Sequence, residues 1–228
     1  MENFNKYFDH TLLKPDAAPQ DILKVVSEAV SLDAAAVCVN GCHVRSVRRF
    51  IDAAGSAVKV AAVAGFPLGA MSTNAKAYEV QLAIEDGAQE IDLVMNIGQA
   101  KAGNWAYVED EVYAIAEMCH DSGVILKLII ETCLLTDEEI VRACRSACEA
   151  GADFVKTSTG FSSGGATVQA VSLMKQTLAD ADPDGRVKIK ASGGIRTLDS
   201  ALAMIEAGAD RLGCSATAAI LEEYKNRG

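Results

Sequence analysis

Two lysines stand at the ends of apolar segments, where a charged side chain is costly to bury. Lys156 follows Phe154-Val155 and is followed at once by hydroxyl residues and Gly160, while Lys190 ends a second short run after Lys188. A lysine that is kept neutral in such a place is a nucleophile for carbonyl carbons and forms a Schiff base with them. The chemistry expected of this chain is therefore covalent catalysis on a carbonyl compound, provided that the fold brings a site together around the lysines.

Short apolar runs alternate along the chain with segments of helical periodicity. Strands are expected over residues 8–13, 35–39, 58–64, 90–96, 125–131, 154–157, 187–191 and 211–214, and helices over 22–30, 44–54, 73–86, 105–122, 137–150, 168–179, 198–207 and 216–224. Strict alternation with uniformly apolar strands is typical of a parallel sheet covered on both faces. Eight such units predict an α/β fold, a (β/α)8 TIM barrel that forms a single domain over residues 1–228. An open doubly wound sheet is the alternative.

Composition narrows the kinds of partner. The net charge is −10, which argues against nucleic acid or an anionic membrane surface, since both attract basic patches. The apolar runs fall short of the roughly 20 residues that a membrane span needs, and Met1-Glu2-Asn3-Phe4 lacks the basic region of a secretory signal. The seven cysteines are odd in number and form no CxxC, which favours reduced thiols in a cytoplasmic protein.

Functional side chains of such barrels gather at the carboxyl ends of the strands. The polar residues expected there are Asp9, His10, Cys38, Asn40, Gly65, Asp92, Asn96, Lys127, Glu131, Lys156 to Thr159, Lys190, Ser192, Gly213 and Ser215. Because Lys156 and Lys190 end consecutive strands, their ammonium groups would approach within about 6 Å and repel by about 3 kcal/mol at an effective dielectric near 20. This repulsion lowers the pKa of a lysine, and burial lowers it further, so a useful fraction of free amine is expected near neutral pH.

Asp92 would moderate this repulsion and could move protons. The residues alone leave open which lysine is the nucleophile. They also leave open a purely structural role, in which each lysine ends its strand, pairs with a carboxylate and extends to solvent.

Two glycine-containing loops follow the last two strands. Ser192-Gly193-Gly194-Ile195-Arg196 follows the seventh and Gly213-Cys214-Ser215 the eighth, and each leads into a helix. Glycines let backbone N–H groups approach an anion at a helix N-terminus, and barrels often bind phosphate at these two loops. We therefore expect a phosphorylated ligand, with tight turns that merely need glycine as the alternative.

A metal site is not expected. The histidines His10, His43 and His120 lie far apart in the predicted topology, whereas a metal-dependent enzyme of this kind needs clustered ligands. Cys144 and Cys148 lie four residues apart on one predicted helix, but no histidine stands at a matching spacing.

Seven motifs, in order along almost the whole chain, are those of a known family. They are Asp9-His10-Thr11-Leu12-Leu13-Lys14-Pro15, Val37-Cys38-Val39-Asn40, Gly65-Phe66-Pro67-Leu68-Gly69, Glu90-Ile91-Asp92-Leu93-Val94-Met95-Asn96-Ile97-Gly98, Leu128-Ile129-Ile130-Glu131-Thr132, Phe154-Val155-Lys156-Thr157-Ser158-Thr159-Gly160-Phe161 and Lys188-Ile189-Lys190-Ala191-Ser192-Gly193-Gly194-Ile195-Arg196. With these motifs the chain closely resembles the deoxyribose-phosphate aldolases, specifically their shorter bacterial form.

The resemblance implies a class I aldolase that needs no metal or other cofactor. It would reversibly cleave the phosphosugar 2-deoxy-D-ribose 5-phosphate to acetaldehyde and D-glyceraldehyde 3-phosphate. By motif, Lys156 would carry the Schiff base, Lys190 would lower its pKa and Asp92 would act as acid and base through a water. The substrate-binding residues expected from the strand ends, the loops and the motifs are Asp9, Cys38, Thr159, Gly160, Gly193, Gly194, Arg196, Gly213 and Ser215. The oligomeric state stays open, with a homodimer as one option.

Some positions depart from the family pattern. Asn40-Gly41-Cys42 stands where Asn-Pro and an aromatic residue are expected, Gly213-Cys214-Ser215 where Gly-Thr-Ser is common, and Ala216 where serine is frequent. The end of the chain has no tyrosine tail, which leaves a tail-assisted proton step in doubt. The competing interpretations are another phosphosugar barrel enzyme, such as a transaldolase-like enzyme or an isomerase, and a phosphosugar sensor without chemistry.

Overall fold

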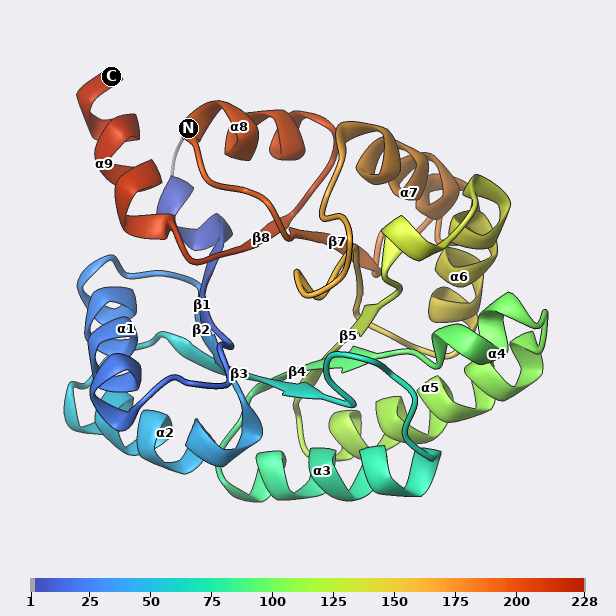
Figure 1. The fold of residues 1–228 in the computed structure, drawn as a ribbon, viewed down its shortest axis with the longest axis horizontal. Helices are drawn as coiled ribbons and strands as arrows, with labels where there is room; N and C mark the ends of the chain where they lie inside the picture. The colour runs from blue at the N-terminus through green and yellow to red at the C-terminus, as the bar shows by residue number, and fades with distance from the viewer. Residues whose placement is uncertain (1–2, 228) are drawn as a thin grey trace.

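The apolar runs form eight parallel strands that close on themselves. The computed structural model describes residues 3–227, so Met1, Glu2 and Gly228 at the chain ends lie outside the described residues. Each strand pairs with the next along the chain, and the last pairs with the first (Figure 1). The strands are β1 (Phe8–Leu12), β2 (Ala36–Val39), β3 (Lys59–Ala64), β4 (Glu90–Val94), β5 (Ile125–Ile129), β6 (Phe154–Lys156), β7 (Lys188–Ser192) and β8 (Arg211–Cys214). The predicted (β/α)8 barrel is confirmed, and the open sheet is wrong.

Helices ring the barrel and connect successive strands (Figure 1). They are α1 (Pro19–Ser31), α2 (Val44–Ala53), α3 (Thr73–Glu85), α4 (Ile97–Lys101), α5 (Trp105–Asp121), α6 (Asp137–Glu149), α7 (Val168–Ala181), α8 (Leu198–Glu206) and α9 (Thr217–Arg227), with short 3-10 turns η1 (Phe4–Tyr7), η2 (Gly41–His43) and η3 (Thr132–Leu134). Within residues 3–227 no helix combines the length and the apolar composition needed to cross a membrane.

The expected strands over residues 90–96 and 125–131 are each about two residues too long. Asn96 instead accepts a hydrogen bond from the Gln99 N–H at 3.2 Å and begins α4, a five-residue helix too short to show a period in the sequence. Glu131 has φ 55°, a left-handed conformation that ends the extended chain after β5. Both residues therefore belong to the loops at the barrel mouth rather than to the strands.

Alternation along the strands separates two apolar layers. On β3, Val60, Ala62 and Ala64 pack against the helices in the main core, whereas Ala61 and Val63 face the inside of the barrel. The strand register also sets the site, since Asp92 lies directly beside Lys127, and Lys156 beside Lys190, on neighbouring strands. Side chains at paired positions of adjacent strands point to the same face, so these four meet inside the barrel.

A buried ion pair fastens the outer side of β4 to two helices. The Lys76 ammonium on α3 donates to Glu111 on α5 at 2.7 Å and to the backbone carbonyl of Val94 at 2.8 Å, and neither charged side chain is exposed. Removing one partner of such a pair leaves an uncompensated charge in a dry interior. The pair therefore holds the carboxyl end of the strand that carries Asp92.

We expect Lys76→Met to lower the free energy of unfolding by about 3–5 kcal/mol, because the Glu111 carboxylate is left buried without a cation. The double variant Lys76→Met/Glu111→Leu should recover much of that loss. Urea denaturation followed by circular dichroism measures both. Lys101→Met is the control, because Lys101 pairs with Glu139 at a partly exposed site and should cost less than about 1 kcal/mol. A double variant no more stable than the single one would contradict this account.

Candidate active site

Seven charged side chains fill the inside of the barrel around Asp92. Three are carboxylates and four are cations: Asp9, Glu90 and Asp92, with Lys127, Lys156, Lys190 and Arg211. The side chains are almost entirely buried, the most exposed being Arg211 at 15%. Because these buried charges are shielded from water, they are screened poorly, and the excess of one cation over the carboxylates is costly. The excess positive charge therefore favours the loss of a proton from one cation of the cluster.

The Asp92 carboxylate is shared by three ammonium groups. Its Oδ2 accepts hydrogen bonds from the Nζ atoms of Lys156 and Lys190, both at 2.7 Å, and its Oδ1 accepts one from Lys127 at 2.8 Å. Burial alone would raise the pKa of Asp92, but Lys127, Lys156 and Lys190 outweigh it and hold that pKa well below its usual value. Asp92 is therefore an anion at neutral pH.

Lys156 and Lys190 have opposite pKa shifts. Burial lowers the pKa of Lys156, Asp92 opposes this and Lys190 adds to it, and the net effect is a lowered pKa. Burial also acts to lower the pKa of Lys190, but Asp9 and Asp92 outweigh it, so the pKa of Lys190 is raised. The difference arises because Lys190 has a second carboxylate, Asp9, at 2.5 Å. Lys156 is therefore the better placed of the two to exist as a free amine.

The lower part of the cluster supports this arrangement. Lys127 is fully buried and lies 2.5 Å from Glu90, and carboxylates raise its pKa against the effect of burial. Arg211 lies 2.6 Å from Asp9, and burial of that carboxyl is outweighed by Lys190, Arg211 and Lys127, which lower its pKa. Two of these residues, Glu90 and Arg211, were missed from the sequence because they begin their strands. Parity was the available signal, since Glu90 and Asp92 share a face of β4.

A cavity of about 330 Å³ opens above the lysines. Of the residues predicted to hold substrate, Thr159, Gly160, Gly193, Gly194, Arg196, Gly213 and Ser215 line it, and so does Lys156. Arg196 is exposed at its rim. The cavity thus lies between the buried charges and the two glycine loops that the sequence singled out.

The other two predicted substrate residues lie within the charged cluster and not in the cavity wall. Asp9 is buried between Lys190 and Arg211. The Cys38 Sγ lies 3.9 Å from the Asp92 Oδ2, and burial, with Asp92 adding to it, raises the pKa of this thiol to about 11. Cys38 is therefore a neutral thiol at physiological pH.

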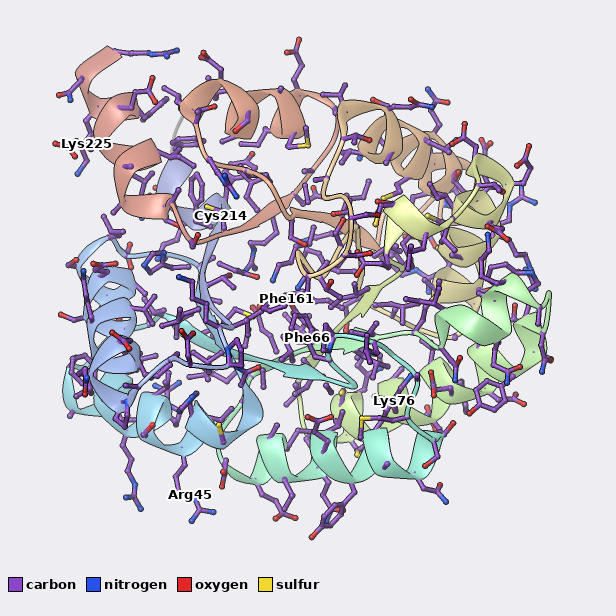
Figure 2. All side chains as sticks on the ribbon, viewed as in Figure 1. Arg45, Phe66, Lys76, Phe161, Cys214 and Lys225 are labelled. Atoms are coloured by element: carbon purple, nitrogen blue, oxygen red, sulfur yellow. The ribbon has the colours of Figure 1, made fainter. Side chains whose placement is uncertain are left out.

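The glycine loop after β7 packs closely against the loop that follows β6, where glycines on both sides leave no side chain between the two backbones. Gly193 and Gly194 have φ of 85° and 81°, and a Cβ added at Gly193 would lie 3.0 Å from the Gly165 Cα. The loop of residues 157–166 therefore seats directly on the loop after β7. The same loop carries Phe161, whose ring meets that of Phe66 edge to face with ring centroids 5.2 Å apart. Figure 2 shows both residues near the middle of the molecule.

His10, expected near the site, points away from the cluster. Its Nε2 lies 3.0 Å from the Glu28 carboxylate of α1, and the side chain is buried between β1 and that helix. His120 pairs with Asp153 at 3.1 Å on the outside of the barrel. Across residues 3–227 no group of three or more His, Cys, Asp or Glu side chains has the geometry to hold a metal ion.

A closed (β/α)8 barrel with a cavity at the carboxyl ends of its strands, above buried charged residues, is the architecture of the barrel enzymes. The family comparison is more specific, since residues 4–222 match the model of the DeoC/LacD family of aldolases. The chain belongs to this family and is an aldolase, a lyase.

Comparisons with individual relatives support the same family assignment. A deoxyribose-phosphate aldolase of Finegoldia magna is 53% identical over 96% of this chain and 98% of its own length. The crystal structure of a putative deoxyribose-phosphate aldolase from Coccidioides immitis has a TM-score of 0.93 at 37% identity, over 97% of this chain and 85% of that one. The tetrameric enzyme of Aeropyrum pernix has a TM-score of 0.89 at 32% identity, over 98% of this chain and 92% of that one. The resemblance inferred from the motifs is confirmed.

The opposite pKa shifts predict opposite effects on stability. A lowered pKa means that folding disfavours the ammonium form of Lys156, so Lys156→Met should leave the melting temperature at pH 7 unchanged or raise it, since Asp92 keeps two cations. A raised pKa means that folding favours the ammonium of Lys190, so Lys190→Met should lower the melting temperature by several degrees. Differential scanning calorimetry compares the two variants with the parent. Equal losses in both variants would show that the surplus charge does not matter.

Proposed function

We propose that the protein reversibly cleaves 2-deoxy-D-ribose 5-phosphate to acetaldehyde and D-glyceraldehyde 3-phosphate through a Schiff base on Lys156. The observation that carries this proposal is the lowered pKa of Lys156 at the wall of a cavity whose rim is made of glycine loops. The names of the relatives add the substrate class. A phosphorylated aldehyde fits such a site, because one end requires a nucleophilic amine and the other requires backbone N–H donors and a cation.

The reaction is written from the side chains present. The Lys156 amine attacks C1 of the open-chain sugar, and protonation of the resulting hydroxyl and loss of water leave a protonated imine. Removal of the C3 hydroxyl proton breaks the C2–C3 bond, releases D-glyceraldehyde 3-phosphate and leaves an enamine on the lysine. Protonation at C2 and addition of water then release acetaldehyde and restore the amine.

Asp92 and Lys190 would have different roles, proton transfer for Asp92 and electrostatic stabilisation for Lys190. Asp92, through a water, would pass protons between Lys156 and the reacting oxygens, since its Oδ2 already lies 2.7 Å from the Lys156 Nζ. Lys190 would keep its proton, lower the pKa of Lys156 by repulsion and stabilise negative charge that develops beside it. Asp9, between Lys190 and Arg211, would hold Lys190 in the protonated form.

The phosphate would bind between the loops that follow β7 and β8, at the rim of the cavity. Gly193 and Gly194 precede α8, and Gly213 and Ser215 precede α9, so backbone N–H groups of these two loops would donate to the phosphate, with Gly213 next to the Lys190 side chain. Arg196 and Gly160 would complete the site. No cofactor would take part, and the protein would work in the cytoplasm. A homodimer is one option for its assembly, and the relative from Aeropyrum pernix is described as tetrameric.

The covalent step is tested by trapping. We expect sodium borohydride with acetaldehyde to add one reduced two-carbon unit to Lys156, located by peptide mass spectrometry, and to abolish activity. A chelator should leave turnover of deoxyribose 5-phosphate unchanged. Lys156→Met is the control and should not be labelled. Labelling of Lys190 would reverse the assigned roles, and activity with ketose phosphates alone would favour a transaldolase-like enzyme.

The role of Lys190 is tested by the pH profile. Lys190→Met removes a cation that lowers the pKa of Lys156 and frees Asp92 to attract the remaining ammonium, so the acidic limb of the profile should move to higher pH. The rate of borohydride-trapped imine formation at pH 7 should fall at least about tenfold and recover at higher pH. Lys225→Met on α9 is a surface control. An acidic limb at the parent position would exclude this role.

A further inference from the structure

Glu131 is a buried acid that the reaction above does not use. It lies after β5 at the barrel mouth, with 1% of its surface exposed, and it keeps a left-handed backbone with φ 55°. Both features are unfavourable for a glutamate unless its surroundings compensate them. In the described part of the chain its carboxylate meets no lysine or arginine, and its hydrogen bonds are with Thr159 and, at 3.9 Å, the Cys133 thiol.

Thr159 donates to Glu131 twice. Its backbone N–H lies 3.2 Å from Oε1 and its hydroxyl 2.5 Å from Oε2. Because the hydroxyl proton is committed to the carboxylate, the oxygen is left to accept the Phe161 N–H at 3.1 Å. The carboxylate thus fixes the turn from Thr159 through Gly160 to Phe161.

This turn forms one wall of the cavity. Thr159, Gly160 and Phe161 all line it, and Gly160 has φ 83° and seats against the Gly193 loop. The residue after Glu131 adds a second link, since the Thr132 N–H donates to the Thr157 carbonyl at 2.9 Å. The contacts of residues 131–132 therefore fix the chain just beyond Lys156 on the side of the glycine loops.

We propose that Glu131 is a positioning residue that sets the phosphate affinity of the site by holding the Thr159-Gly160-Phe161 turn. The inference rests on the proposed function, because it assumes that phosphate binds at the glycine loops after β7 and β8. The carboxylate acts through Thr159 and does not touch substrate. Lys156 makes its own contacts with Asp92, so the loss of Glu131 should weaken binding of the phosphate end and leave the lysine chemistry largely intact.

Glu131→Gln is the sharpest variant, because it keeps the shape of the side chain. A glutamine offers one acceptor oxygen where Glu131 offers two, so either the N–H or the hydroxyl of Thr159 loses its partner. We expect KM for 2-deoxyribose 5-phosphate to rise at least about tenfold with kcat within about threefold, and kcat/KM for unphosphorylated 2-deoxyribose to change less than about threefold. The preference for the phosphorylated sugar should fall accordingly.

Two further variants sharpen the test. Thr159→Val removes the hydroxyl but keeps the N–H, so it should also weaken phosphate binding, and combining it with Glu131→Gln should cost less than the sum of the two. Thr159→Val also tests the proposal if Glu131→Gln does not fold. Glu139→Gln is the matched control, since the Glu139 carboxylate likewise accepts a backbone N–H, from Thr136 at 2.8 Å, but at the start of α6. Glu139→Gln should leave KM and kcat for both sugars unchanged.

Binding of inorganic phosphate, measured by calorimetry without turnover, separates this proposal from the proposed function. A parent protein that binds phosphate but does not cleave the sugar would overturn the function alone. Weaker phosphate binding in Glu131→Gln and Thr159→Val supports the positioning role. Equal loss of activity on both sugars, a fall in kcat at constant KM, or unchanged phosphate binding in the variants would overturn it.

Discussion

The shared carboxylate of Asp92 is the interaction on which the rest of the barrel interior depends. Three ammonium groups converge on its two oxygens, and each comes from a different strand. Without this anion, Lys127, Lys156 and Lys190 would repel one another in a medium that screens charge poorly. The closed barrel makes the arrangement possible, because the three lysines come from the consecutive strands β5, β6 and β7 and all reach Asp92 from inside the barrel.

One carboxylate cannot neutralise three cations, and the neighbouring residues determine which lysine has no second carboxylate partner. Lys127 has Glu90 and Lys190 has Asp9, whereas Lys156 relies on Asp92 alone. The lysine without a second carboxylate is also the one that reaches the cavity. The same surplus charge that makes Lys156 costly to bury therefore favours its neutral form where a carbonyl carbon can reach it.

The sequence alone predicted the barrel well and the site in part. The alternation of apolar strands and helices was strong enough to fix the topology, and the strand-end rule found Lys156, Lys190, Asp92 and the glycine loops. The short helix α4 was missed because five residues show no periodicity. Glu90 and Arg211 were missed because they begin strands, and their inward direction matters only once the barrel is closed. Which lysine has the lower pKa required the distance from Asp9 to Lys190, and no sequence pattern contains it.

The departures from the family pattern lie away from the charged cluster, and this limits what they can change. Cys214 lines the active-site cavity, but it pairs in register with the outward-pointing His10 and its Sγ lies 3.4 Å from the Thr217 hydroxyl at the start of α9, so its side chain is directed away from the lysines. Asn40 and Gly41 line a separate cavity of about 410 Å³ together with Phe66, whose ring meets Phe161 at the active-site mouth. A small residue at position 41 leaves space behind Phe66, while Asp92 and its three lysines are untouched. Variation of this kind would therefore act on the shape of the mouth, whereas the proton balance of Lys156 is set by groups that the departures do not reach.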